Sequence, residues 1–184
     1  MTVTVSNIGP QSGTDISMAS GHRLHHQGKV IQTVYVRTDT RGTYASNNSG
    51  NGTAITPLNL TITPQRADSI IWLRWTVFYE LHHDTVFLVQ RDGNLIGYNL
   101  NRGNARWSGI LTPHYDNDYG STPQTSTINW FDVAGSTAAR TYQLATRSAG
   151  GSNFTFALNR PVGSTGQDSH EAGVSFGFAR EISG

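Results

Sequence analysis

The histidines are the residues of this sequence best suited to bind a metal ion. His22, His25 and His26 lie in GHRLHHQG, and His82 and His83 are adjacent in ELHHDT. Zinc needs three or four ligands that converge in a tetrahedron, whereas adjacent side chains of a strand point to opposite faces. Neither group has the i, i+4 spacing of a helical metalloprotease site. The spacing therefore predicts no metal site within one chain; the alternative is a histidine repeated around the symmetry axis of an oligomer.

Acidic residues cluster in HYDNDYG, which contains Asp116 and Asp118, and Asp132 follows in NWFDVAG. Two carboxylates near an aromatic ring could serve a glycosidase. The same residue types are also typical of Asx turns between strands, and no nucleophile elbow or phosphate-binding loop is present. We therefore predict no catalytic residue, no enzyme activity and no cofactor. A glycan depolymerase that uses Asp116, Asp118 or Asp132 is the alternative from the enzyme class.

Aromatic residues in the same region could bind a sugar. Trp107 lies in NARWSG, shortly before Tyr115 and Tyr119. Exposed rings can stack on the apolar faces of pyranoses. We predict that contacts to a glycan or receptor come from Trp107, Tyr115, Asp116, Asp118 and Tyr119. The alternative for Trp107 is packing at the edge of the fold, and a free carbohydrate-binding module would use the same residues.

Composition limits the remaining possibilities. The chain has 184 residues, a net charge of +1 and no cysteine, which removes disulfides and thiolate chemistry. It has no run of lysine or arginine, so we predict no nucleic-acid partner. MTVTVSNIGPQSG at the amino terminus is not a signal peptide, and no stretch approaches the ~20 apolar residues of a membrane span. We expect a protein that stays in the compartment where it is made and does not insert into a membrane.

The elements that must position these residues are strands. Period-two alternation of apolar residues, interrupted by Gly, Ser, Asn and Pro clusters, predicts strands over 30–36, 58–62, 69–81, 85–90, 95–100, 126–133, 140–148, 153–159 and 173–182. Asp92-Gly93 predicts a tight hairpin turn. No segment has helical periodicity. The pattern predicts an all-β fold, an antiparallel β-sandwich or jelly roll.

Two stretches lack this alternation. Residues 38–57 predict an exposed loop, and residues 1–28 predict an extended N-terminal arm ahead of a sandwich domain over 29–184. The arm has too few apolar residues to offset the entropy cost of ordering alone. Through Val3, Val5 and Ile8 it would add a strand to a partner's sheet. The alternative is that it forms the first strand of its own sandwich.

The segment SIIWLRWTVFYEL, residues 69–81, is apolar on both of its faces. One face carries Ile71, Leu73, Trp75, Val77, Tyr79 and Leu81 and predicts the core. The other face is too apolar for solvent and too charged for a core, and we predict that a neighbouring subunit or a second layer covers it. Its candidate interface residues are Ile70, Trp72, Arg74, Phe78 and Glu80. Residues 173–182 likewise have Val174, Phe176 and Phe178 in phase.

An ordered series of short motifs carries a family resemblance, from about His22 to Ile182. These are HRLHHQGKVIQTVYV, PLNLTITPQRADSIIWLRWTVFYE, FLVQRDGNLIG, RTYQLATRS, FALNR and GVSFGFAREI. Together they resemble a domain of tail-fibre and minor virion structural proteins of tailed bacteriophages, especially those of marine and cyanobacterial hosts. The resemblance implies a β-sandwich that assembles as a homotrimer on the virion and exposes loops to a host glycan or protein receptor.

The resemblance also implies a location and further partners. The protein would assemble in the bacterial cytoplasm and reside in the virion, where its N-terminal arm would contact other virion proteins. The resemblance begins only about twenty residues into the sequence, so we expect no long shaft ahead of the domain. A capsid decoration protein, either a head fibre or a cement protein, is therefore the alternative position on the particle.

Overall fold

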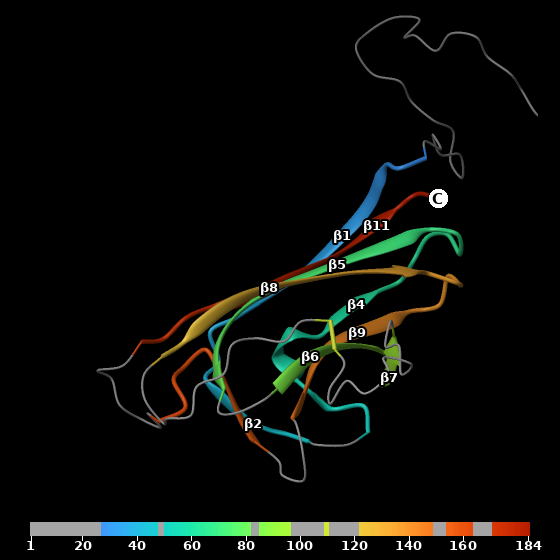
Figure 1. Cartoon of the computed structure of the whole chain (residues 1–184). Helices are drawn as coiled ribbons and strands as arrows, with labels where there is room; N and C mark the ends of the chain where they lie inside the picture. Colours follow the sequence, from blue (N-terminus) through green and yellow to red (C-terminus); the bar gives the residue numbers. More distant parts are fainter. Residues whose placement is uncertain are drawn as a thin grey trace, which may run out of the picture.

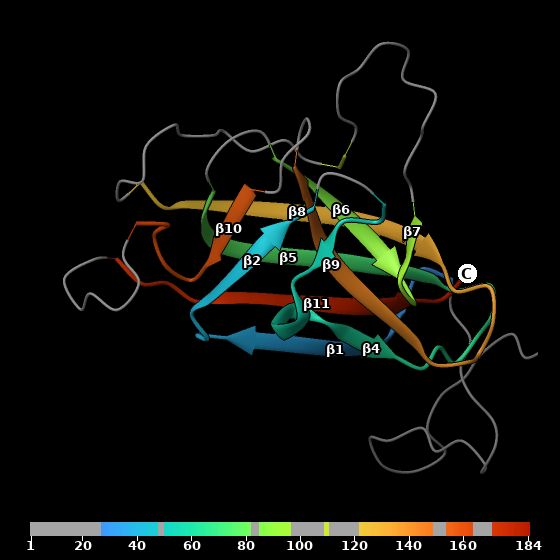
Figure 2. The same cartoon turned by 90° about the horizontal axis from the view of Figure 1, so that it is seen from below.

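The structure is a computed structural model, which describes residues 27–47, 50–81, 85–96, 109–110, 122–148, 154–163 and 171–184. These residues form two antiparallel β-sheets that pack face to face (Figures 1 and 2). The predicted all-β sandwich is confirmed. In this part of the chain, no helix has the length and apolar character needed to cross a membrane. Nearly all of the predicted N-terminal arm lies outside the described residues.

The large sheet has six strands in the order β1-β11-β5-β10-β2, and β8 also pairs with β5. The long strand β5 is the centre of this sheet, because it pairs with β8 over residues 70–79 and with β11 over residues 70–76. The strands are β1 (Val30–Thr38), β2 (Gly42–Ser46), β5 (Ile70–Leu81), β8 (Gln124–Val133), β10 (Phe154–Leu158) and β11 (Ser175–Ile182).

The small sheet has five strands in the order β3-β9-β6-β7, and β4 pairs with β9. The strand predicted over 58–62 is shorter than expected, since Leu58 belongs to a short 3-10 helix, η1 (Thr56–Leu58). The strands are β3 (Thr53–Ala54), β4 (Leu60–Ile62), β6 (Thr85–Arg91), β7 (Asn94–Ile96) and β9 (Arg140–Ser148).

The core lies between the two sheets. The inner face of β5 is fully buried there, as the sequence predicted, and the small sheet covers it with side chains from β4, β6 and β9. The rings of Tyr79, Phe87 and Phe156 contact one another, with centroids 5.2–5.8 Å apart. The buried β5 residues are Ile71, Leu73, Trp75, Val77, Tyr79 and Leu81.

The hairpin turn between β6 and β7 has the predicted geometry. Asp92 and Gly93 have φ values of 53° and 79°. Positive φ at both central residues is what a type I′ hairpin turn requires. Strands β6 and β7 therefore pair directly across the turn, with Arg91 opposite Asn94, and Asp92 lies in the turn between them.

Strand β6 is buried on both of its faces. Phe87 points into the main core, whereas Val86 and Leu88 belong to a second, small cluster. Gly109 lies against that second side, since an added Cβ would be 2.6 Å from the Cβ of Val86. The N–H of Ile110 donates to the carbonyl of Phe87 at 2.8 Å. The connection between β7 and β8 is thus fixed to β6 at residues 109–110.

The prediction of an exposed loop over residues 38–57 is wrong in part, because this stretch contains β2, β3 and η1. Strand β2 has the sequence GTYAS, in which only Tyr44 is large, and the ring of Tyr44 packs 6.5 Å from that of Phe156. Backbone pairing with β10 holds this strand. A strand that is stabilised mainly by hydrogen bonds to its neighbour needs few apolar residues, so its sequence shows little apolar alternation.

The apolar phase of β11 points away from the core. Phe176 and Phe178 face outward, and the buried positions are the small or polar residues Ser175, Gly177, Ala179 and Glu181. The reason lies on the neighbouring strand. A Cβ on Gly177 would be 2.5 Å from Cδ1 of Trp75, so the indole on β5 occupies the space that a larger β11 side chain would need.

The two ends of the large sheet differ in what they carry. At one end, Ile70 pairs with both Ile182 and Val133, and the N–H of Gly28 donates to the carbonyl of Ser183 at 2.8 Å. We name this the terminal end, because the described chain both begins and finishes there. Figure 1 shows the C-terminus at this position.

The opposite end, the far end, lies where Tyr79 pairs with Gln124 at the start of β8. The distance from Ile70 to Tyr79 along β5 is about 30 Å at ~3.3 Å per residue. The connection that follows β7 therefore enters β8 at the far end, well separated from the point where residues 1–26 join the sandwich.

Candidate functional site: the outer face of the large sheet

The outward side chains of β1, β11, β5 and β8 form a surface that the small sheet does not cover, in which apolar residues and arginines lie beside the polar residues Thr33, Thr125, Thr127 and Asn129. Successive strand residues alternate between faces, so every second residue of these strands reaches this surface. We name it the outer aromatic face. It consists of Val30, Tyr35, Ile70, Trp72, Phe131, Val133, Val174, Phe176 and Phe178, together with Arg37, Arg74 and Arg180.

Trp72 is the centre of this surface. Its ring stacks on that of Phe131 at 6.0 Å with an interplanar angle of 13°, and meets Phe178 edge-on at 5.3 Å. The guanidinium carbon of Arg180 lies 4.3 Å from the Phe178 ring centre and 5.5 Å from that of Trp72. Such cation–π contacts hold the arginine flat against the rings. The cluster is therefore an ordered platform built from three neighbouring strands.

The outer aromatic face contains all the large hydrophobic residues that are exposed in the described part of the chain. Tyr35 is 83% exposed, Phe131 58% and Phe176 49%. Val30, Val133 and Val174 complete the set. Single exposed apolar residues are normal, but a contiguous exposed patch is typical of an interaction site.

The charge on this face has one sign. Arg37, Arg74 and Arg180 point outward, and the exposed outward residues of the four strands include no aspartate or glutamate. Among the described residues, none of the three arginines forms an ion pair. The surface therefore presents aromatic rings and uncompensated positive charge together.

Four of the five predicted interface residues lie on this side of β5. Ile70, Trp72 and Phe78 are half-buried and Arg74 is exposed. Gly173 of the same chain packs on Phe78, because an added Cβ would be 2.1 Å from Cγ of that ring. Only part of the Phe78 ring is thus left for a neighbour.

Glu80 has a different environment, since it is 1% exposed. Its carboxylate accepts hydrogen bonds from the N–H of Val162 at 2.7 Å and from the hydroxyl of Thr122 at 2.9 Å. Its partners in the structure therefore belong to its own chain. These contacts fix the segments before β8 and after β10 at the far end.

Several residues of the outer aromatic face were missing from the sequence prediction. Tyr35 and Phe131 belong to strands whose core-facing phase dominated the pattern, and Arg180 lies between Ala179 and Glu181. A signal was present: residues 126–133 have a second apolar phase, and the large apolar residues of 173–182 share one phase. Only their pairing with β5 brings these phases onto one surface.

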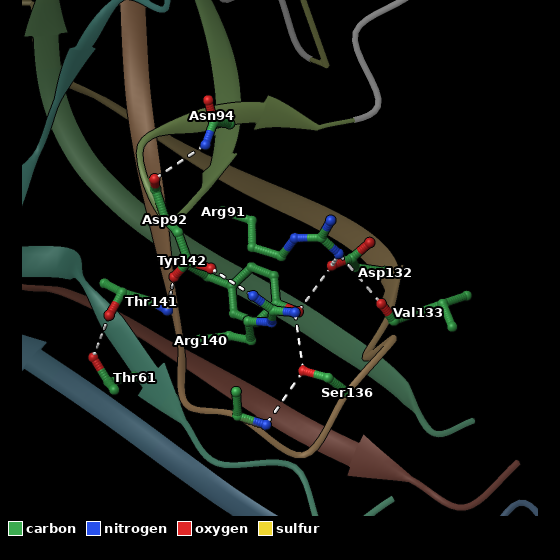
Figure 3. Close-up of polar contacts among 11 residues, drawn as sticks. Thr61, Arg91, Asp92, Asn94, Asp132, Val133, Ser136, Arg140, Thr141 and Tyr142 are labelled. Atoms are coloured by element: carbon green, nitrogen blue, oxygen red, sulfur yellow. Dashed lines mark hydrogen bonds and ion pairs between the residues drawn. The ribbon is translucent and has the colours of Figure 1, made fainter. Parts of the chain in front are cut away.

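A second cluster of charged residues joins the two sheets at the terminal end (Figure 3). Asp132 on β8 accepts hydrogen bonds from Nη1 of Arg91 at 2.8 Å and from the hydroxyl of Tyr142 at 2.9 Å. Asp92, in the β6–β7 turn, accepts from Nη1 of Arg140 at 3.1 Å. Both carboxylates thus pair with an arginine, and Asp132 bridges the large sheet to strands of the small sheet.

Tyr142 contributes to this cluster as a neutral donor. Burial raises the pKa of its hydroxyl, and the hydrogen bond to Asp132 and the charge of that carboxylate raise it further. The phenol therefore keeps its proton at neutral pH and donates it to Asp132. This arrangement acts as a brace between the sheets, which is the role that we assign to Asp132.

The other predicted contact residues lie outside the described residues. These are Trp107, Tyr115, Asp116, Asp118 and Tyr119 of the glycan or receptor set, and Val3, Val5 and Ile8 of the arm. All seven histidines also lie outside. The part of the chain that the structure describes has no group of three or more potential metal ligands.

Comparison with known proteins adds no family to this picture. No protein-family model matches the chain, and no curated protein matches it in sequence.

Proposed function

We propose that this chain is a structural protein of a tailed-bacteriophage virion, a homotrimeric tail-fibre or receptor-binding knob. The observation that carries the proposal is the outer aromatic face. The sandwich already has a complete core between its sheets, so folding does not require a second apolar face. A surface with exposed Tyr35, Phe131 and Phe176 supports a protein that works within an assembly.

The two-ended organisation supports the same role. The segment with Val3, Val5 and Ile8 joins the sandwich at the terminal end, next to Ser183. The segment that contains Trp107 and Tyr115 enters β8 at the far end, about 30 Å away along β5. We infer that the segments for attachment to the particle and for contact with a host receptor join the sandwich at opposite ends of the large sheet.

Immunogold electron microscopy of the particles tests this proposal. An antibody raised against the purified chain should label intact virions of the phage that encodes it, at the tail. Label over the head would instead assign the chain to the capsid decoration alternative. Particles without label, together with free protein in the lysate, would contradict a virion role altogether.

Adsorption provides the test of the knob function. Purified protein should bind host cells and compete with phage attachment, because receptor-binding knobs saturate the receptor. Incubation with the host polysaccharide should release no new reducing ends. Appearance of reducing ends that the Asp116→Asn or Asp118→Asn variant abolishes would favour the depolymerase instead.

A further inference from the structure

We propose that the outer aromatic face of one copy packs against the same face of other copies of this chain, and that this association tightens as salt concentration rises. The inference rests on the proposed homotrimer and adds to it which surface forms the contact and how that contact responds to ions. The argument has four steps: composition, size, self-complementarity and charge.

The composition of the face matches the centre of a protein–protein interface. Interface cores are enriched in aromatic residues and arginine and depleted of lysine, aspartate and glutamate. The outward residues of β1, β5, β8 and β11 follow this distribution in part: they include tyrosine, tryptophan, phenylalanine and arginine, and the exposed ones include neither lysine nor acid, but Thr33, Thr125, Thr127 and Asn129 are also exposed. Trp, Tyr and Arg are also the residue types that dominate binding energy.

The size of the face fits a protein partner. Four paired strands span about 19 Å at ~4.8 Å each. The register of β5 with β8 over residues 70–79 is about 30 Å long at ~3.3 Å per residue, and that of β11 with β1 over residues 175–182 is about 23 Å long. The projected area is roughly 500 Å², and side chains that stand up from the sheet increase the accessible area. A standard interface takes ~800 Å² from each partner. A single sugar ring would cover only a small part of this surface.

The partner surface must itself be apolar, and in the described part of the chain only one surface qualifies. Every exposed large hydrophobic residue described belongs to the outer aromatic face. The outward side of β6, by contrast, is already covered, since Val86 and Leu88 are buried. For a second copy, the matching surface is therefore the same face.

This contact brings like charges together. Arg37, Arg74 and Arg180 of each copy approach those of its neighbour, and no carboxylate on the exposed outward positions compensates them. Arg180 is already stacked on Phe178, but Arg74 is exposed and makes no ion pair among the described residues. Salt screens repulsion between exposed charges, so the apolar contact should strengthen in salt.

The salt response separates this proposal from the main alternative for an arginine-rich aromatic surface. Binding of a polyanion, whether acidic glycan or nucleic acid, weakens steeply as salt rises. Self-association through this face should do the opposite. The sign of the salt effect is therefore decisive, and it does not depend on knowing the host or the receptor.

Sedimentation equilibrium of the full chain at about 50 mM and about 500 mM NaCl tests the proposal. We expect a single oligomer whose dissociation constant falls at the higher salt. Arg74→Gln should tighten association by roughly two- to fivefold at low salt and lose that advantage at high salt. Arg41→Gln, which removes the same charge from the exposed β1–β2 turn, is the matched control and should change nothing.

Phe131→Ser should weaken association by about tenfold or more, because it removes an exposed ring that stacks on Trp72. Thr125→Ser, an exposed outward position of the same strand, is its control, and circular dichroism confirms that both variants fold. A chain that stays monomeric at both salt concentrations would overturn the proposal, as would an oligomer that Arg74→Gln weakens. Either result would leave the virion role to immunogold labelling, which is independent of the oligomeric state.

Discussion

The inner and outer faces of the large sheet both carry large apolar residues, but they differ in how far these residues are buried. On β5 the inner face is completely buried, from Ile71 to Leu81. The outer face carries Trp72 on the same strand and Phe131 on its neighbour, yet these remain accessible. A sandwich needs only one apolar face per sheet. The inner apolar residues therefore form the core, whereas the outer ones are available for contact with another molecule.

The two tryptophans of β5 differ in the same way, and their indole N–H groups show it. The indole N–H of Trp75 donates to the carbonyl of Leu58 at 2.9 Å. The indole N–H of Trp72 has no acceptor among the described residues, and its ring contacts Phe131, Phe178 and Arg180. Trp75 is therefore part of the core, whereas Trp72 is part of the ring cluster on the outer aromatic face.

The largest expected effect comes from replacing each of these two tryptophans with alanine. Trp75→Ala should lower the free energy of unfolding by about 3–5 kcal/mol, because it leaves a large cavity in the core and an unpaired carbonyl. Trp72→Ala should cost only about 1 kcal/mol in the monomer, since it removes surface ring contacts. Urea denaturation of dilute protein measures both. Equal losses would show that the outer face is also part of the folding core.

The next largest effect is expected at Gly177, one of the small residues that β11 directs toward the core. Gly177→Ala should cost about 1–3 kcal/mol through overpacking, since the new methyl group would meet Trp75 and the backbone carbonyl of Arg74, 2.9 Å away. Thermal melting measures the loss. In a Trp75→Leu background the additional cost should fall. An unchanged cost there would mean that the indole does not set the orientation of β11.

The smallest expected effect is the pH dependence of stability that comes from Glu181, a carboxylate on the inner phase of β11. Burial opposes ionisation of Glu181, but hydrogen bonds from the side chain of Gln32 at 2.6 Å and from the N–H groups of Gln65 and Arg66 outweigh it. The pKa of Glu181 is therefore lowered from its ordinary 4.5. A lowered folded pKa contributes stability that is present above about pH 4.5 and lost as pH falls through the folded pKa.

The Glu181→Gln variant checks the sign of this effect. It should be less stable than the original chain above about pH 4.5 and converge with it at lower pH, where Glu181 is protonated in both folded and unfolded chains. Denaturation curves collected across this range measure the difference. Parallel pH profiles would assign the acid sensitivity to other carboxylates.

Much of the fold follows from local pattern. The alternation in residues 140–148 and 153–159, and the Asp92-Gly93 turn, predicted elements that the structure contains, because strand period and positive φ are properties of a few adjacent residues. Strand β2 escaped prediction because its stability comes from pairing with β10, which no local pattern records. The same holds for Glu80, whose partners Thr122 and Val162 are distant in sequence.

By itself the sequence determined that this chain forms short antiparallel strands, that 69–81 has two apolar faces and that Ile71 to Leu81 build a core. Only the tertiary structure decided that the apolar phase of β11 faces outward, because Trp75 leaves room for glycine but not for phenylalanine beside it. It also decided that Tyr35, Trp72, Phe131 and Arg180 share one surface, since strand register joins residues that are far apart along the chain. Period two assigns side chains to two faces of a strand, and packing of the second sheet decides which face is buried.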